Sequence, residues 1–269
     1  MSGFAPINQN LSYWQKQAKP LFPDLAWNIP EQKTSTLTIV GGNLQSFSNV
    51  IRTAEYAGRT FPLKHIATIL PDVLRKKLPS LENVNFAPST SSGSFAKSYP
   101  IEEYCASGDM ILLAGDLSHN AETAIAITDA IQKSEKPFII TRDTIDLIAS
   151  ASSQILSHQN MFMIGSMSQI QKIFRAVYYP RMVMLSQPLL PVIETLHKFT
   201  LSYPVTILTF HQENIIVASN GNITTTHIHD TDYTPISLWS GQLAIKVAAL
   251  NLYNPNEPFK ATTAAILYK

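Results

Sequence analysis

Four short segments of the sequence carry side chains that could do chemistry. They are the glycine turns Gly41-Gly42-Asn43 and Gly115-Asp116-Leu117, the single aspartate Asp143, and the histidine pair His227 and His229. Glycines between a strand and a helix let backbone amides approach a phosphate, and the N-terminus of the helix favours an anion. A tight turn that requires a positive φ angle explains the same glycines equally well.

The two aspartates are the acidic candidates for catalysis. Asp116 could bind a ribose hydroxyl or a magnesium ion, but it could also cap the following helix or brace its own loop. Asp143 follows the next strand-like run, and its structural alternative is to cap the helix through Ile145 and Leu147. Residue type and position alone favour the structural role for Asp116.

The histidines and the cysteine give no stronger signal. His227 and His229 are expected to share one face of a strand, because side chains two residues apart point the same way. Such a pair could hold zinc, but a structural zinc site needs four ligands and no third ligand is apparent, so we expect no metal site. Cys105 is the single cysteine, which excludes a disulfide framework, and we expect it to be a small buried residue.

Strand-like and helix-like runs alternate from Ser35 onward. Strands are expected at residues 37–40, 65–70, 110–114, 137–140, 161–164, 205–208, 215–218 and 223–229. Helices are expected after most of these strands, and Gly58 stands where the first helix would end. The alternation predicts an α/β fold with a mostly parallel sheet covered on both faces, and Asn220-Gly221 predicts an antiparallel edge hairpin.

In such a sheet, ligands bind beyond the carboxyl ends of the strands. The segments that follow Val40, Ala114, Ile140 and Ile164 are therefore the ones in which to look for a site. These segments include both glycine turns and Asp143.

The first 34 residues differ from the rest. Residues 1–34 carry four prolines, Pro20, Pro23 and Pro30 among them, and two of the three tryptophans, Trp14 and Trp27, as in an extended arm with aromatic anchors. The arm could pack on its own domain, which we slightly favour, or on a neighbouring subunit. We therefore predict an arm at 1–34, a single domain at 35–269, and a homo-oligomer.

The overall composition excludes several classes of partner. Lys and Arg number 20 against 19 Asp and Glu, so a net charge of +1 gives no field that would attract nucleic acid or an anionic membrane. No apolar run approaches the roughly 20 residues of a membrane span. The N-terminus lacks the basic start and apolar run of a signal peptide, so we expect a cytoplasmic protein.

The order of these pieces resembles the ribokinase-like dehydratases that repair hydrated NAD(P)H. Thr38 to Asn43 resembles their strand ending in G-G-S, Ala114-Gly115-Asp116-Leu117 resembles G-P-G-L, and Pro137 to Asp143 resembles the strand ending in D-A-D. The helix from Gln242 resembles the one that follows G-T-G-D. The resemblance covers residues 35–269 in order and spacing. It implies a three-layer α/β/α ribokinase-like fold and a nucleotide or dinucleotide ligand, with ADP or ATP and magnesium as the cofactors.

The catalytic positions of that family differ here. Leu238-Trp239-Ser240-Gly241 stands at G-T-G-D, so Gly241 replaces the aspartate, and in the T-P-H-x-G-E region Ser166 and Gln169 replace the histidine and the glutamate. The resemblance implies that the amides of the G-T-G-D turn stabilise charge on a transferred phosphoryl group, while its aspartate accepts the hydroxyl proton. Glycine cannot accept a proton, and loss of a general base costs roughly 10²–10⁴-fold in rate. Trp239 also places a large side chain where phosphates need open backbone.

Three hypotheses follow. The first is a diverged member that has lost the reaction and retains at most nucleotide or dinucleotide binding. Its candidate contacts are Gly41, Gly42, Asn43, Gly115, Ser240 and Gly241. The second is an active ADP- or ATP-dependent dehydratase or small-molecule kinase that uses Asp116 and Asp143. The third is a structural or assembly protein in which Trp239 fills the old cleft.

Overall fold

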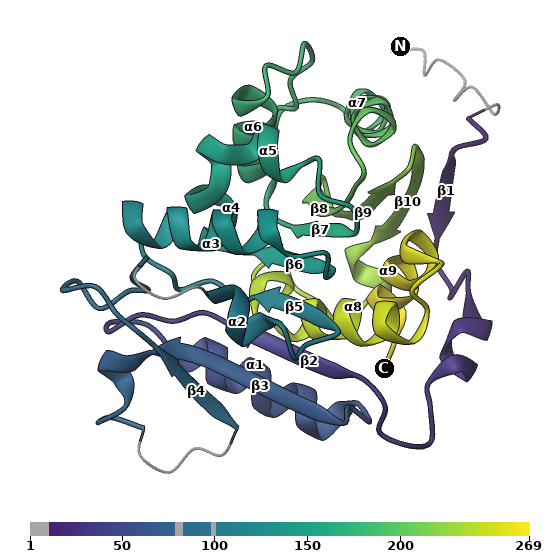
Figure 1. Cartoon of the computed structure of the whole chain (residues 1–269). Coiled ribbons are helices and arrows are strands. Elements are labelled where there is room, and N and C mark those ends of the chain that lie inside the picture. The colour runs from purple at the N-terminus through teal and green to yellow at the C-terminus, as the bar shows by residue number, and fades with distance from the viewer. Residues whose placement is uncertain (1–10, 79–82, 98–100) are drawn as a thin grey trace.

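A ten-stranded sheet runs through residues 11–78, 83–97 and 101–269, the parts of the chain that this computed structural model describes (Figure 1). The strand order across the sheet is β1-β10-β9-β8-β7-β6-β5-β2-β3-β4. Every neighbouring pair is parallel except β8 with β9 and β9 with β10. The strands are β1 Trp14–Gln17, β2 Thr36–Val40, β3 His65–Pro71, β4 Val84–Ala87, β5 Met110–Leu113, β6 Phe138–Thr141, β7 Met161–Ile164, β8 Val205–His211, β9 Asn214–Ser219 and β10 Asn222–His227.

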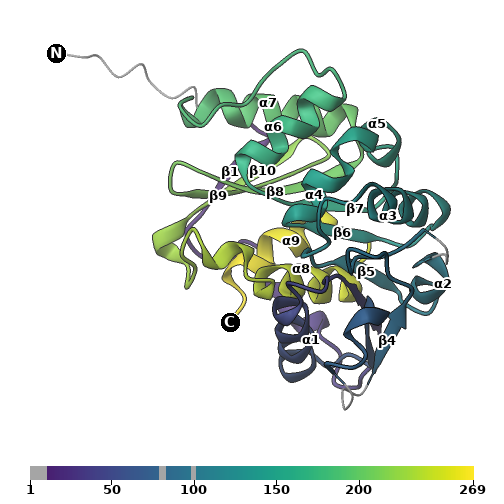
Figure 2. The same cartoon turned by 90° about the vertical axis from the view of Figure 1, so that its left-hand side faces the viewer.

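Helices cover both faces of this sheet (Figure 2). In β2, Leu37 and Ile39 join the apolar cluster formed with α1, α8 and α9, whereas Val40 joins the cluster on the other face. This alternation is what a strand buried on both faces requires. The helices are α1 Ser48–Thr60, α2 Ile101–Cys105, α3 Ala121–Lys133, α4 Asp143–Ile148, α5 Ser152–Ile155, α6 Met167–Ala176, α7 Leu189–Ser202, α8 Gln242–Tyr253 and α9 Pro258–Leu267. The predicted three-layer α/β/α architecture is therefore confirmed.

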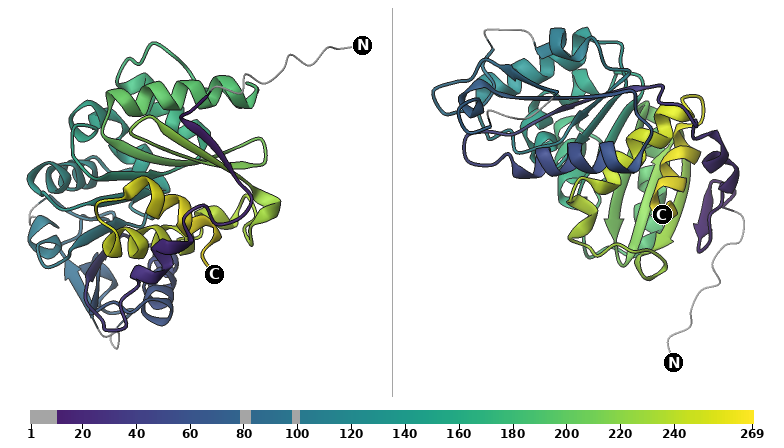
Figure 3. Two further views of the ribbon diagram at one scale, coloured as in Figure 1. Left: turned by 90° about the vertical axis from the view of Figure 1, so that its right-hand side faces the viewer. Right: turned by 90° about the horizontal axis from the view of Figure 1, so that it is seen from below.

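The predicted arm changes one edge of the sheet. Within it, β1 pairs in parallel with β10, so the predicted hairpin β9–β10 lies one strand in from the edge (Figure 3, left). Trp14 Nε1 donates to Thr225 Oγ1 at 3.0 Å, and the buried Gln17 amide donates to Thr226 Oγ1 at 2.9 Å. This part of the arm thus packs on its own chain, while residues 1–10 lie outside the described residues.

Four local features bear on the predictions from the sequence. β10 ends at His227 and His229 lies in the 3₁₀ turn Ile228–Asp230, so the two histidines do not share a strand face. No group of three His, Cys, Asp or Glu side chains that could hold a metal occurs among the described residues. Cys105 is buried at the end of α2, as predicted. None of the helices in the described ranges has the length and apolar character to cross a bilayer.

Gly58 lies inside α1, which continues to Thr60, so the prediction that it ends the helix is wrong. A Cβ atom at this exposed position would meet only Ile66 Cδ1, at an ordinary contact distance of 3.5 Å. Glycine in a helix interior loses roughly 0.5–1 kcal/mol relative to alanine. We therefore expect Gly58→Ala to raise the free energy of unfolding by about 0.5–1 kcal/mol in a urea titration. A decrease would show that α1 is not regular at this point.

Candidate functional site

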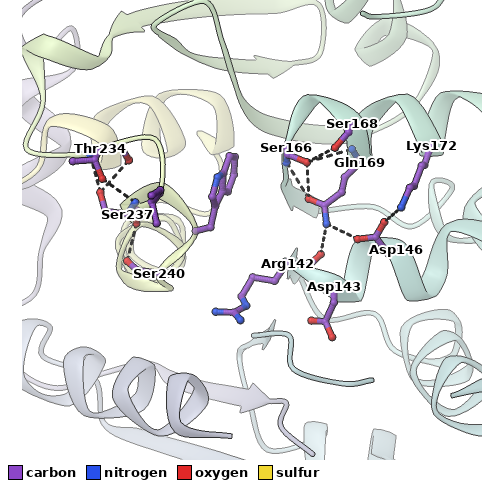
Figure 4. A pocket seen from close by; sticks show the side chains of 12 residues that line it. Arg142, Asp143, Asp146, Ser166, Ser168, Gln169, Lys172, Thr234, Ser237 and Ser240 are labelled. Carbon is purple, nitrogen blue, oxygen red and sulfur yellow. Dashed lines mark hydrogen bonds and ion pairs between the residues drawn. The ribbon is translucent and has the colours of Figure 1, made fainter. Parts of the chain in front are cut away.

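A cavity of about 830 Å³ opens at the carboxyl ends of β6 and β7, where ligands bind in parallel α/β sheets. Figure 4 shows its two walls, with the start of α6 on one side and the turn before α8 on the other. Arg142 and Asp143 lie between these walls. The lining residues are Arg142, Asp143, Asp146, Ser166, Ser168, Gln169, Lys172, Thr234, Ile236, Ser237, Trp239 and Ser240.

Asp143 holds the glycine turn after β5 in place. It is the first residue of α4, whose N-cap is Arg142, so the structural alternative in which Asp143 caps this helix does not apply. Its Oδ1 accepts a hydrogen bond from Asp116 N at 2.6 Å, and its Oδ2 accepts one from Leu117 N at 2.9 Å. Both oxygens of this carboxylate are therefore used to fix a neighbouring backbone loop.

Asp116 pairs with Arg142 rather than capping a helix. Its Oδ1 lies 2.8 Å from Arg142 Nη2, its side chain is 9% exposed, and its Oδ2 is buried without a partner among the described groups. The next helix, α3, is capped instead by Asn120, which accepts from Glu122 N at 2.8 Å. Asp116 and Arg142 both have positive φ angles, 59° and 57°. Such strain in residues other than glycine is maintained only where the surrounding structure enforces it.

The first glycine turn is closely packed against the second. Gly42 N donates to Gly115 O at 3.0 Å, Gly41 N to Ile69 O at 3.3 Å, and Asn43 N to Ser46 O at 2.8 Å. A Cβ atom on Gly41 would lie 2.5 Å from Gly115 O, which explains the absence of a side chain there. The amides of Gly41, Gly42 and Asn43 therefore have partners inside the protein, and their role in nucleotide binding stays a prediction.

Gly115 serves the same packing. It has a φ angle of +85°, and a Cβ atom on it would lie 2.7 Å from Asp143 Oδ1. Asn43 completes the contact between the turns, because its Nδ2 donates to Asp116 O at 2.6 Å. The structure thus brings the two turns, Asp116 and Asp143 together as one interlocked group.

Gly241 is the N-cap of α8 and has a left-handed conformation, with φ at +95°, and as a glycine it makes no side-chain cap. A Cβ atom at Gly241 would lie 2.3 Å from Oγ1 of Thr53, which is buried on α1 and whose hydroxyl has no partner among the described groups. Ser240 lines the cavity, and its Oγ donates to Ser237 O at 2.7 Å. The position that resembles the catalytic aspartate is therefore closed by Thr53.

A second network positions the wall formed by α6. Ser166 and Gln169 make a reciprocal capping box at the start of the helix, a pattern recognisable in the sequence as Ser-x-x-Gln. Gln169 Nε2 also donates to Arg142 O and to Asp146 Oδ2, each at 2.7 Å. The amide thus ties the strained Arg142 backbone to the cavity wall.

Lys172 and Asp146 form an ion pair beside this amide. Burial alone would raise the pKa of Asp146, but hydrogen bonds from Lys172 and Gln169 outweigh it, and the pKa lies below its usual value. Asp146 is therefore a weak base at neutral pH.

Gln169→Glu would restore the family-like residue, and we expect it to destabilise the fold. It removes the donor to Arg142 O and places a second carboxylate against Asp146. Hydrogen bonds involving charged groups contribute about 1.5–3 kcal/mol, so we expect a loss of about 2–4 kcal/mol in a urea titration. The control is Gln132→Glu, because Gln132 bonds the Gln154 amide at the surface; its change should stay within about 0.5 kcal/mol. Equal effects at both positions would contradict the proposed network.

Of the predicted site residues, Asp143 and Ser240 line the cavity directly. Arg142, Asp146 and Lys172 line it too but were not singled out from the sequence. Arg142 could have been found, because it immediately follows β6 at the edge where ligands bind. Asp146 and Lys172 lie on separate helices, and nothing in the sequence indicates that they pair.

Comparison with known proteins shows a relationship in fold. No protein-family model matches the sequence, and no curated protein matches it. A ribokinase-like superfamily protein from Enterococcus faecalis is similar in structure, with a TM-score of 0.63 and 12% identity over 96% of this chain and 87% of that one. A hypothetical protein from Streptococcus mutans gives a TM-score of 0.61 and 13% identity over 90% and 86% of the two chains.

A third similar structure has a described activity. It is an ADP/ATP-dependent NAD(P)H-hydrate dehydratase from Bacillus subtilis, co-crystallised with ATP and Mg²⁺, with a TM-score of 0.58 and 14% identity over 90% of this chain and 83% of that one. At such low identity these similarities show the fold alone. The chain described here has a ribokinase-like fold.

Proposed function

We propose that this ribokinase-like chain binds a nucleotide-like ligand in the cavity between α6 and α8 and does not catalyse dehydration or phosphoryl transfer. The observation that carries the proposal is the start of α8. Gly241 offers no proton acceptor, and Thr53 Oγ1 occupies the space that an aspartate Cβ would need. A general base must reach the proton it removes, and a backbone glycine supplies none.

The remaining carboxylates support this proposal because each is already engaged. Asp143 accepts two backbone hydrogen bonds, Asp116 pairs with Arg142, and Asp146 pairs with Lys172. Use of Asp143 or Asp146 as a base would require these contacts to break, and the Oδ2 of Asp116, which has no partner among the described groups, is buried. The second hypothesis, an enzyme that relies on Asp116 and Asp143, is correspondingly disfavoured.

The cavity itself supports ligand binding over a filled cleft. Trp239 lines the cavity and leaves about 830 Å³ open beside it, a volume within the range of small-molecule sites. The first-turn amides of a helix have no acceptor within that helix. The N-cap Gly241 makes no side-chain cap at α8, and Ser240 just before it lines the cavity, so we propose that Ser240 and the amides that follow it receive an anionic part of the ligand.

ATP with Mg²⁺, with which the Bacillus subtilis protein was co-crystallised, fits these residues poorly. Magnesium in ATP sites is usually held by one or two carboxylates together with phosphate oxygens. The carboxylates that line this cavity are Asp143 and Asp146, and both already have partners. We therefore derive no step that involves magnesium.

Two measurements on the purified chain test the proposal. Isothermal titration with AMP, ADP, ATP and NADPH should give saturable binding for at least one of them. A coupled assay on hydrated NADPH with ADP or ATP should give no turnover above the rate without protein. Turnover that is lost in an Asp116→Ala or Asp143→Ala variant shown by circular dichroism to be folded would instead establish an active enzyme. Absence of binding for all four ligands would favour an assembly protein.

A further inference from the structure

The charged side chains that line the cavity balance one another. Arg142 and Lys172 are the cations, and Asp143 and Asp146 are the anions. Arg142 is held by Asp116 at 2.8 Å, and Lys172 is held by Asp146. No surplus positive charge therefore faces a ligand from the described lining side chains, and a polyphosphate would lie beside two carboxylates. Like charges repel one another, and they do so more strongly in a partly desolvated site than in water.

The wall before α8 has a different character. Trp239 packs against the apolar core and also lines the cavity, so its indole is anchored before any ligand arrives. Ile236, which is 85% exposed, lies three residues before Trp239 and also lines the cavity. Together, Trp239 and Ile236 give this wall an apolar surface, as is usual for the lining of small-molecule sites.

The opposite wall, at the start of α6, carries two serine hydroxyl groups. Ser166 and Ser168 lie at the start of α6 across the cavity from the turn before α8, as Figure 4 shows. Their hydroxyl oxygens are 2.9 Å apart, and serine hydroxyls can both donate and accept hydrogen bonds. A flat ring with polar edges would meet an apolar surface on one side and these hydroxyls on the other.

We infer that the ligand is a nucleoside or a nucleoside monophosphate, whose base stacks on Trp239 and which carries no more than one phosphate. The inference rests on the proposed function and names its ligand class. A phosphomonoester carries about −1.5 to −2 charges, and a helix N-terminus supplies the equivalent of about +0.5, so α8 can partly neutralise one such group. Further phosphates would find no counter-charge on the lining side chains.

Titration calorimetry in magnesium-free buffer tests the ligand class. Adenosine, AMP, ADP and ATP are titrated into the full chain. We expect AMP to bind at least about tenfold more tightly than ATP, the change that ~1.4 kcal/mol of repulsion produces.

Variants at Trp239 test the stacking. Stacking of a base on an aromatic side chain is worth about 1–3 kcal/mol, so Trp239→Leu should weaken AMP binding roughly 5- to 150-fold, whereas Trp239→Phe should retain most of it. The control is Tyr178→Leu, because Tyr178 is an aromatic residue 93% exposed outside the cavity lining. It should leave AMP binding unchanged, and thermal melting checks that each variant is folded.

The outcomes separate this inference from the proposed function. If ATP binds more tightly than AMP, or if the folded Trp239→Leu variant binds AMP as the parent does, the inference is wrong while nucleotide binding without turnover stands. If none of the four ligands binds and NADPH does not bind either, the proposed function and the inference both fail. Tight AMP binding that Trp239→Leu weakens and Trp239→Phe preserves supports both.

Discussion

Asp143→Ala is expected to lower the free energy of unfolding by about 3–5 kcal/mol, the largest effect of any single change considered. The carboxylate accepts from Asp116 N at 2.6 Å and from Leu117 N at 2.9 Å, and both of these residues are buried. A buried donor that loses its acceptor costs about 1–3 kcal/mol, and here two donors lose theirs. Urea titration followed by circular dichroism measures the change.

Asp109→Ala is the matched control for this variant. Asp109 also accepts a hydrogen bond from a backbone amide, that of Thr36 at 2.9 Å, but it does so at the surface. Water can replace this acceptor, so the loss should stay near 1 kcal/mol. If Asp143→Ala cost no more than Asp109→Ala, Asp143 would not brace the loop. A catalytic role for Asp143 would then be favoured again.

The second large effect is expected at the start of α8. Gly241→Asp restores the residue type that the ribokinase-like motif carries, yet we expect it to destabilise the protein by about 2–5 kcal/mol and to produce no turnover of hydrated NADPH. A left-handed residue other than glycine costs roughly 1–2 kcal/mol, and overpacking adds about 1–3 kcal/mol. The overpacking arises because the new Cβ would lie 2.3 Å from Thr53 Oγ1.

A double-mutant cycle isolates this contact. Thr53→Ala removes the hydroxyl that blocks the Cβ position, so Gly241→Asp should cost less in the Thr53→Ala background than in the parent. The gain should be about 1–3 kcal/mol, the overpacking part of the penalty. Gly241→Ala serves as the control, because it introduces the same Cβ without a charge. Additive effects, or turnover by the Gly241→Asp variant, would refute the view that Thr53 closes this position.

Much of the architecture could be predicted from the order of residues. Short β-branched runs such as Leu37 to Val40, each followed by a turn and a helical pattern, specify parallel strands because both faces of such strands must be buried. The hairpin at Asn220-Gly221 is equally predictable from the sequence, because Asn-Gly favours a tight turn between antiparallel strands. The short β4 and α2 were missed, because β4 is only partly buried and lacks a continuous apolar run, and the five residues of α2 carry too little periodicity to be recognised.

Roles of single residues were less predictable. Asp116 and Asp143 stood out in the sequence, but whether each would bind a ligand, cap a helix or brace a loop remained open. Their spatial partners decide this, and those partners, the Arg142 guanidinium and the amides of Asp116 and Leu117, could not be assigned from the sequence. Long-range contacts have no local signature, because they depend on how the strands are ordered in the sheet.

The sequence by itself determined the layered fold and the identity of the N-cap residue of α8, Gly241. Both follow from local periodicity and residue type, which do not depend on tertiary contacts. Only the tertiary structure decided that Thr53 occupies the space beside Gly241 and that Lys172 is neutralised by Asp146. These pairs join residues that are distant in sequence or lie on separate helices. The packing of helices on the sheet brings them within contact, and steric exclusion and Coulomb attraction act only at such short range.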